Sequence, residues 1–341
     1  MSYYNPSFKV SQKSLIIFGW FCISVLFVLL DFKRFLSFNS VDEELFLNIS
    51  QADSSVHFIR YVIWGYYISF LTNVSLLFPI IFNLFIFSYT LNVFVKKFEL
   101  QKIYLVLLLC IPSLFLFSQT ILRDFFLLTL NMILFLKINQ KTNFKSISII
   151  VFLISIIFIL RPLFGLILFF SCASSFLIKR VKFSLSYVLL GQIVIVFVLL
   201  SFPSIKEMFF TEYNTLNVDD VFSLLRIDTF NVDDFQLAIG VFFNWLLYYF
   251  GINLSMNNSL LLFPFILESI IYLIFFSSFI FFNKMKYKEN YLYRFSFWII
   301  IYSILSSVVE ADWASVYRHK LFFLPALLYL VSLNNFKKST K

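Results

Sequence analysis

Long apolar runs separated by short polar stretches make up most of the chain. A helix needs about 20 predominantly apolar residues to cross a bilayer, and ten of the runs come close to that length. We therefore predict an all-α bundle of about ten transmembrane helices. The predicted spans are residues 14–31, 73–95, 103–119, 122–136, 146–160, 163–178, 183–202, 259–283, 295–309 and 321–334.

Two further apolar segments, residues 57–72 and 236–252, are rich in aromatic side chains. Counting the first as a span would move the lysine cluster at 96–102 to the side opposite most other lysines. We therefore predict that both segments are interfacial helices at the outer surface. Trp245, Tyr248 and Tyr249 suit this position, because amphipathic rings settle at the headgroup level.

The distribution of lysine along this path sets the orientation. Across ten alternating spans, sixteen of the nineteen lysines fall on one side, and the positive-inside bias makes that side the cytoplasm. Both termini are then cytoplasmic. Several arginines fall on the other side, which the same bias should deplete of cations. Five of them are candidate site residues: Arg60, Arg123, Arg161, Arg226 and Arg318.

The composition indicates one integral membrane domain over residues 1–341. The chain is 61% hydrophobic and 13% charged, with a mean hydropathy of +0.90. The two larger outer loops, about residues 32–72 and 203–258, are too short for a separate soluble domain. The net charge of +9 is explained by lysines at cytoplasmic helix ends and does not indicate a nucleic-acid partner.

Several signatures of other enzyme classes are missing. The sequence has no Gly-rich nucleotide loop, no HExxH motif and no nucleophile elbow, and its cytoplasmic loops are too short to bind a nucleotide sugar. Any sugar donor must then be lipid-linked and act at the outer face. Cys22, Cys110 and Cys172 lie inside apolar runs and are predicted to be single buried thiols. We predict no metal and no cofactor.

Two outer arginines lie at very short turns between predicted spans. Arg123 and Asp124 occur in SQTILRDFFLLTL, and Arg161 precedes Pro162 in ILRPLFG. An arginine at membrane depth must pair or face a polar cavity, and its planar fork suits bidentate contact with phosphate or carboxylate. Alternatively, each guanidinium reaches up to lipid phosphate.

Arg318, His319 and Lys320 stand together immediately before the last predicted span. Three such residues on the outer side run against the charge bias, so a local purpose is the better explanation. His319 could act as a general base near neutral pH. Alternatively, Glu310 could neutralise these cations and give them a structural role.

Acidic residues supply further candidates. Asp42 and Glu43, in the first outer loop, could accept a proton from a substrate hydroxyl or simply begin a solvated loop. Glu268 lies inside the eighth apolar run, where a charge is costly, so it is either functional or the partner of an arginine. Arg60 could contact lipid headgroups, and Arg226 could be paired with nearby carboxylates.

Three patterns are similar to those of multi-spanning bacterial enzymes that use polyprenyl-linked sugars. They are IPSLFLFSQTILRDFFLLTLNMILFL, ILRPLFG and YRHKLFFLPALLYL. Among these enzymes the chain most resembles oligosaccharide repeat-unit polymerases of the Wzy/EpsG type, which build O-antigen or capsule chains. The acidic first loop also resembles that of GT-C glycosyltransferases, in which the carboxylate acts as base.

The resemblance implies a glycosyltransferase of GT-C-like fold in the bacterial inner membrane, with its active site facing the periplasm or cell exterior. It would transfer a growing glycan from undecaprenyl diphosphate to a sugar hydroxyl of the next lipid-linked unit. Its partners would be lipid-linked oligosaccharides, membrane lipids, a flippase and a chain-length regulator. The alternatives are a GT-C transferase with a polyprenyl-monophosphate donor and a non-enzymatic exporter of lipid-linked oligosaccharides.

The same resemblance implies roles for the candidate residues. The diphosphate would be bound by three arginines at helix ends, Arg123, Arg161 and Arg318. The catalytic base would be one of Asp42, Glu43 and His319. Accessory roles would fall to the remaining charged candidates, which are Arg60, Arg226, Glu268 and Glu310.

Overall fold

The computed structural model describes residues 11–31, 59–139, 144–178, 185–200, 245–246, 249–250, 259–282, 290–309 and 313–333. Within these ranges every regular element is a helix. The elements are α1 (Gln12–Leu29), α4 (Ile59–Thr72), α5 (Phe78–Lys97), α6 (Lys102–Leu109), α7 (Pro112–Ser118), α8 (Arg123–Ile138), α9 (Phe144–Leu160), α10 (Pro162–Leu177), α11 (Leu185–Leu200), α14 (Ser259–Phe282), α15 (Tyr291–Tyr302), α16 (Ile304–Val309), α17 (Trp313–Lys320), the 3-10 turn η3 (Leu321–Phe323) and α18 (Leu324–Ser332).

In these residues, helices occupy all ten predicted spans. Seven are single helices, and three consist of two pieces: α6 with α7, α15 with α16, and η3 with α18. The first break has a local cause. Pro112 lacks an N–H and disfavours helical backbone at the preceding residue, and Ile111 is extended with ψ 116°.

Three helices of the described chain are long and apolar enough to cross a membrane. They are α1, α5 and the part of α14 from Phe263 to Ile280. Helices α9 and α10 and residues Tyr291–Ser306 are apolar but shorter. The fold is therefore all-helical with three candidate spans in its described part, and the ten-span path with its orientation remains a prediction.

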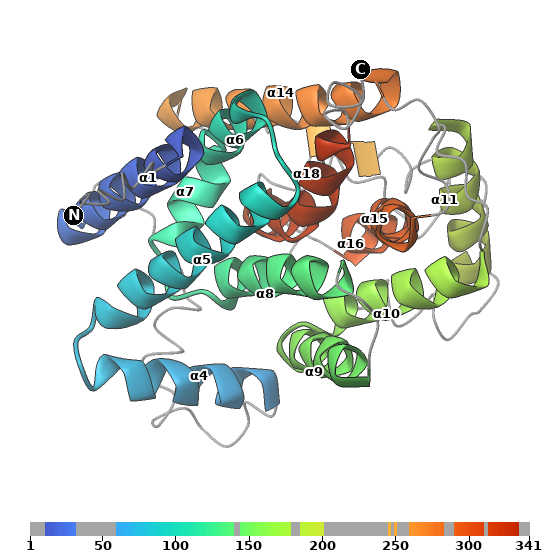
Figure 1. The fold of residues 1–341 in the computed structure, drawn as a ribbon. Coiled ribbons are helices and arrows are strands. Elements are labelled where there is room, and N and C mark those ends of the chain that lie inside the picture. The colour runs from blue at the N-terminus through green and yellow to red at the C-terminus, as the bar shows by residue number, and fades with distance from the viewer. Residues whose placement is uncertain are drawn as a thin grey trace, which may run out of the picture.

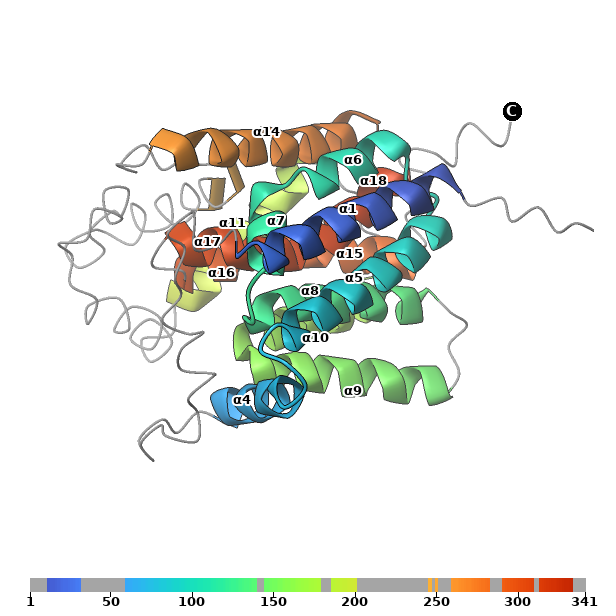
Figure 2. The ribbon, with the colours of Figure 1, turned by 90° about the vertical axis from the view of Figure 1, so that its left-hand side faces the viewer.

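The helices pack around α18, in which every residue from Leu324 to Ser332 is buried. Helix α18 contacts α15, α14 and α8, and Figure 1 shows it enclosed near the middle of the bundle. Helices α8, α9 and α10 lie side by side, as Figure 2 shows. The amide nitrogen of Asn131 in α8 donates to the carbonyl of Phe322 at 2.7 Å, which joins α8 to the turn that follows α17.

Residues 59–72 of the segment predicted to be helical form α4, which packs on α9 and α5. It runs across α9: Figure 1 shows α4 lengthwise and α9 nearly end-on, and Figure 2 shows the reverse. The outward side of α4 is apolar, with Tyr66 69% and Phe70 73% exposed. The placement of α4 at the membrane interface stays a prediction.

Two expectations about individual side chains are wrong. Trp245 and Tyr249 are buried rather than at a surface, because Trp245 Nε1 donates to Ser303 Oγ at 2.9 Å and the Tyr249 ring packs against Tyr272. Tyr248 lies outside the described residues. The cysteines are unpaired as expected, but Cys22 and Cys110 are exposed on the outside of the bundle.

Gly165 allows α9 and α10 to approach closely just after the turn that carries Arg161. A Cβ added at Gly165 would lie 2.4 Å from the Phe158 Cα, which is backbone and cannot move alone. We expect Gly165→Ala to destabilise the protein by about 1–3 kcal/mol, the usual cost of overpacking, and to displace Arg161. Thermal unfolding in bilayers measures this.

Gly19→Ala is the matched control, because nothing lies within 4 Å of a Cβ at that position of α1. It should leave the unfolding temperature unchanged or raise it slightly, since alanine is the better helix former. Equal unfolding temperatures for the two variants would contradict the close approach of α9 and α10.

Candidate functional site

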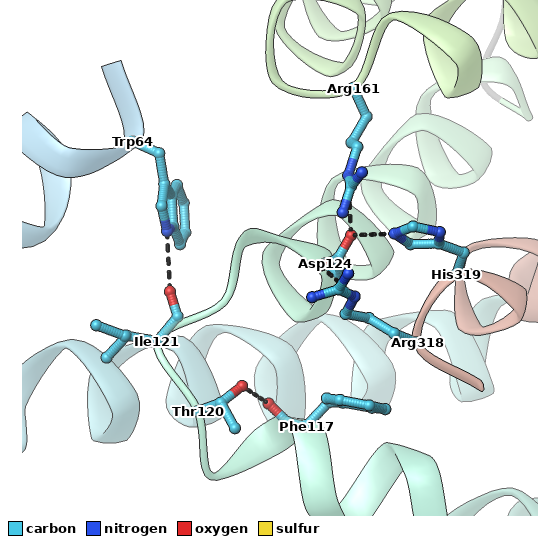
Figure 3. A network of polar contacts seen from close by, with 8 residues as sticks. All are labelled: Trp64, Phe117, Thr120, Ile121, Asp124, Arg161, Arg318 and His319. Atoms are coloured by element: carbon cyan, nitrogen blue, oxygen red, sulfur yellow. Dashed lines mark hydrogen bonds and ion pairs between the residues drawn. The ribbon is translucent and has the colours of Figure 1, made fainter. Parts of the chain in front are cut away.

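A buried carboxylate, Asp124, collects three side chains that come from two other parts of the chain (Figure 3). Arg161 Nε lies 3.3 Å from Oδ1 of Asp124, and His319 Nε2 lies 3.4 Å from the same oxygen. Arg318 Nε lies 3.4 Å from Oδ2. Both carboxylate oxygens are thus engaged by cationic or titratable groups, which forms the network we call the Asp124 cluster: Asp124, Arg161, Arg318 and His319.

Local structure explains how these side chains reach one point. Asp124 lies in the first turn of α8, where a helix N-terminus favours negative charge. Arg161 is the extended residue before α10, and Pro162 begins the helix, a position that proline favours. Arg318 and His319 lie in the last turn of α17. The cluster is therefore formed where α8 begins, where α9 meets α10 and where α17 ends.

The cluster lies at one end of α8, and lysine lies at the other. Helix α8 begins at Arg123 and has Lys137 in its last turn, so about 20 Å of helix separates them at 1.5 Å per residue. Helix α5, which contacts α8, likewise has lysine at its C-terminal end, with Lys96 and Lys97 in its last turn. Arginine and lysine therefore lie at opposite ends of α8, and the orientation of these ends in a membrane stays a prediction.

The depth of the cluster differs between its members. The Asp124 side chain is 2% exposed, whereas those of Arg161 and Arg318 are 18% and 14% exposed. Within the described residues, Asp124 is the sole hydrogen-bond or ion-pair partner of the Arg161 guanidinium, and it engages Nε. The terminal nitrogens of Arg161 are therefore available to an anion that approaches from the exposed side.

A second buried network adjoins the first through Lys320, the neighbour of His319. Lys320 Nζ lies 2.8 Å from Glu268 Oε1. The backbone N–H of Ser113 donates to Glu268 Oε2 at 2.9 Å, and the Ser113 hydroxyl donates to Oε1 at 2.8 Å. Burial lowers the pKa of the Lys320 ammonium, and the Glu268 carboxylate opposes that shift. We call this set the Glu268 network.

Aromatic rings surround the lysine of this network. Lys320 Nζ lies 3.9 Å from the centre of the Tyr317 ring and 5.0 Å from that of Tyr272. Phe265 stacks on Tyr317 with ring centres 4.0 Å apart. A cation over aromatic faces is stabilised by the ring quadrupole, so the ammonium has favourable contacts beyond its carboxylate.

Helix α4 is attached to the turn that leads into the cluster. Trp64 Nε1 donates to the carbonyl of Ile121 at 2.9 Å, as Figure 3 shows. The Trp64 ring also packs on Phe126 in the first turn of α8, with centres 5.4 Å apart. Tyr67 completes the attachment by donating to Asn83 of α5 at 3.0 Å.

The structure brings together some of the predicted site residues. Arg161, Arg318 and His319 meet at Asp124, and Arg123 begins the same helix with a side chain that is 2% exposed. Arg60 lies in the first turn of α4, and its side chain is not among those that the structure describes. The candidates that lie outside the described residues altogether are Asp42, Glu43, Arg226 and Glu310.

Three expectations or omissions need correction. Glu268 is paired, but its partner is Lys320 and not an arginine. Asp124 was not predicted as a site residue, although its place at the start of an apolar run carried the same signal as Glu268, namely an acid where a charge is costly. Ser113 had no sequence signal, because its role depends on a helix 155 positions away in the chain.

Comparison with known protein families, with curated proteins and with solved structures finds no match for this chain. The class that the described residues define is an all-helical protein with candidate membrane spans and two adjoining buried ion networks at one end of its helices.

Proposed function

We propose that the chain is a membrane glycosyltransferase that polymerises undecaprenyl-diphosphate-linked oligosaccharide units at the outer face of the bacterial inner membrane. The observation that supports this most is the meeting of Arg161 and Arg318 on Asp124. The carboxylate pairs with two guanidiniums from separate parts of the chain, and the side chains of Arg161 and Arg318 are 18% and 14% exposed. Such an arrangement suits an anion with several oxygens, such as a diphosphate.

The proposed reaction needs an anion site of this kind. The hydroxyl oxygen of the acceptor unit attacks the anomeric carbon of the donor glycan, and the bond from that carbon to the diphosphate oxygen breaks. The bonding electron pair leaves with undecaprenyl diphosphate, and the hydroxyl proton passes to a base. Arginines fixed before the reaction stabilise the charge that develops on the leaving diphosphate. Arg161 and Arg318 supply these donors, and Arg123, the residue before Asp124, is the third candidate.

The base remains one of three candidates. Asp42 and Glu43 belong to the first outer loop, and His319 touches Asp124 at 3.4 Å. In the proposed arrangement, a flippase supplies the lipid-linked units, a chain-length regulator acts with the enzyme, and membrane lipids surround its helices. The ten-span path, with cytoplasmic termini and the arginine ends outside, places the Asp124 cluster at lipid-phosphate depth.

Gene disruption in the source bacterium tests the proposal. We expect surface polysaccharide to shrink to single repeat units on its anchor, because units would still be made and exported but not joined. Electrophoresis of the extracted polysaccharide measures chain length. The intact gene restores long chains, and so should a gene carrying Lys97→Met, which changes an exposed residue at the other end of the helices.

Two other outcomes would contradict the polymerase. Long chains of normal length after disruption would exclude this role. A truncated repeat unit would instead indicate a GT-C transferase that adds one sugar during synthesis of the unit.

A further inference from the structure

The Glu268 network is not used by the proposed reaction, yet it is the most deeply buried charge pair described. Glu268 is 0% exposed and Lys320 is 1% exposed at the side chain. Removing two charges from water costs several kcal/mol per ion, and a buried pair is therefore weak as a source of stability. Its best-attested use is to select one packing arrangement over others, so the elements that it joins matter.

The Glu268 network joins three elements at the end of α17. Glu268 lies in α14, Ser113 lies in the first turn of α7, and Lys320 is the last residue of α17. The residues just before Lys320 turn toward a different neighbour: Arg318 and His319 contact Asp124 of α8. The last turn of α17 is thus held from two sides by two ion networks.

Rotation of α17 would break both networks. Successive residues of a helix are about 100° apart around its axis, so Arg318 can face Asp124 only while Lys320 faces Glu268. If Lys320 lost its partner, an unpaired ammonium would remain buried. A rotation of α17 that turned this ammonium toward water would lower the free energy of the protein. That motion would carry Arg318 away from Asp124.

We propose that Glu268 and Lys320 are a positioning pair, which fixes the end of α17 so that Arg318 is held on Asp124 and presented to the diphosphate. The inference rests on the proposed function for the ligand. The positioning of α17 itself can be measured without any ligand. Ser113 contributes by holding both oxygens of the Glu268 carboxylate.

The test compares single variants with a neutral double variant of the full chain in bilayer nanodiscs. Glu268→Gln leaves the lysine buried without its counter-charge, and Lys320→Met leaves the carboxylate without its cation. The double variant Glu268→Gln, Lys320→Met removes both charges at similar volume, which is often tolerated. Lys97→Met is the control for loss of a lysine, because Lys97 is exposed in the last turn of α5.

Hydrogen exchange of residues 313–320 reports on α17, and the affinity for farnesyl diphosphate reports on the anion site. We expect each single variant to exchange about tenfold faster or more in α17 and to bind the probe about tenfold more weakly, since breaking one buried pair is worth more than a factor of ten. The double variant should recover both properties, and Lys97→Met should change neither.

The two readouts separate the two proposals. Exchange in α17 that stays at the wild-type rate in both single variants overturns the positioning role, whatever the affinity. A double variant with wild-type exchange and poor binding also overturns it, because the charges would then act on the ligand directly. Absence of farnesyl diphosphate binding by the wild type contradicts the proposed function, while the exchange rates still decide the positioning role.

Discussion

Asp124→Asn is expected to reduce polymer formation by at least about 100-fold while the protein still inserts into the membrane. Asparagine keeps the shape of the side chain but not its charge, so Arg161 and Arg318 would face each other without the carboxylate between them. Removing one partner of a buried ion pair destabilises the arrangement by about 3–5 kcal/mol, and each 1.4 kcal/mol lowers the population of the correctly arranged site about tenfold. Chain length in the disrupted strain that carries the variant gene measures the loss.

Asp31→Asn is the matched control for this variant. Asp31 is exposed and has a φ of 50°, a backbone region that asparagine tolerates as well as aspartate. It should therefore leave chain length unchanged. Wild-type chain length with Asp124→Asn would show that the Asp124 cluster does not organise the site.

The second large effect is expected from replacing arginine by lysine. Arg161→Lys and Arg318→Lys keep the positive charge, but a single ammonium cannot contact Asp124 through one nitrogen and a phosphate through two others. We expect each variant to bind farnesyl diphosphate about tenfold more weakly or worse, and polymer formation to fall with it. Arg123→Lys should also impair activity.

Arg294→Lys is the control for the same chemical change away from the site. Arg294 lies in α15, and its Nε donates to the carbonyl of Ser175 at 3.0 Å. Lysine there should lower stability without changing affinity for the probe. Full activity of the variants at positions 123, 161 and 318 together would contradict the diphosphate-binding role, because charge alone would then be sufficient.

The helices could be located from the sequence because apolar length is a local property. The helix break before Pro112 was not predicted, although the proline is plain in the sequence. A continuous apolar run of the length of a membrane span looks the same whether or not the helix is interrupted within it. The burial of Trp245 was missed for a different reason. An aromatic residue near a predicted membrane surface has the same local pattern whether it faces headgroups or, as here, donates to Ser303 inside the bundle.

The meeting of arginines from different helix ends could be predicted from the sequence, but their pairings could not. A path of alternating spans would bring every second helix end to one face, so Arg161 and Arg318 could be expected near each other. Which carboxylate lies between them depends on which helices are neighbours. Asp124 is 37 positions from Arg161, and the Glu268 network joins residues of α7, α14 and α17. Such contacts follow from packing, which a single sequence does not display.

The attachment of α4 has a practical consequence for biochemical work on this protein. The helix exposes Tyr66 and Phe70 on one side and donates from Trp64 to Ile121, two positions before Arg123, on the other. In the predicted interfacial placement, lipid headgroups contact the exposed side of α4. A displacement of α4 would then move the turn before α8 through the hydrogen bond from Trp64 to Ile121. Solubilisation in detergent removes that ordered headgroup layer. The choice of solubilising medium, and not only the purity of the preparation, should therefore decide whether the isolated protein is active.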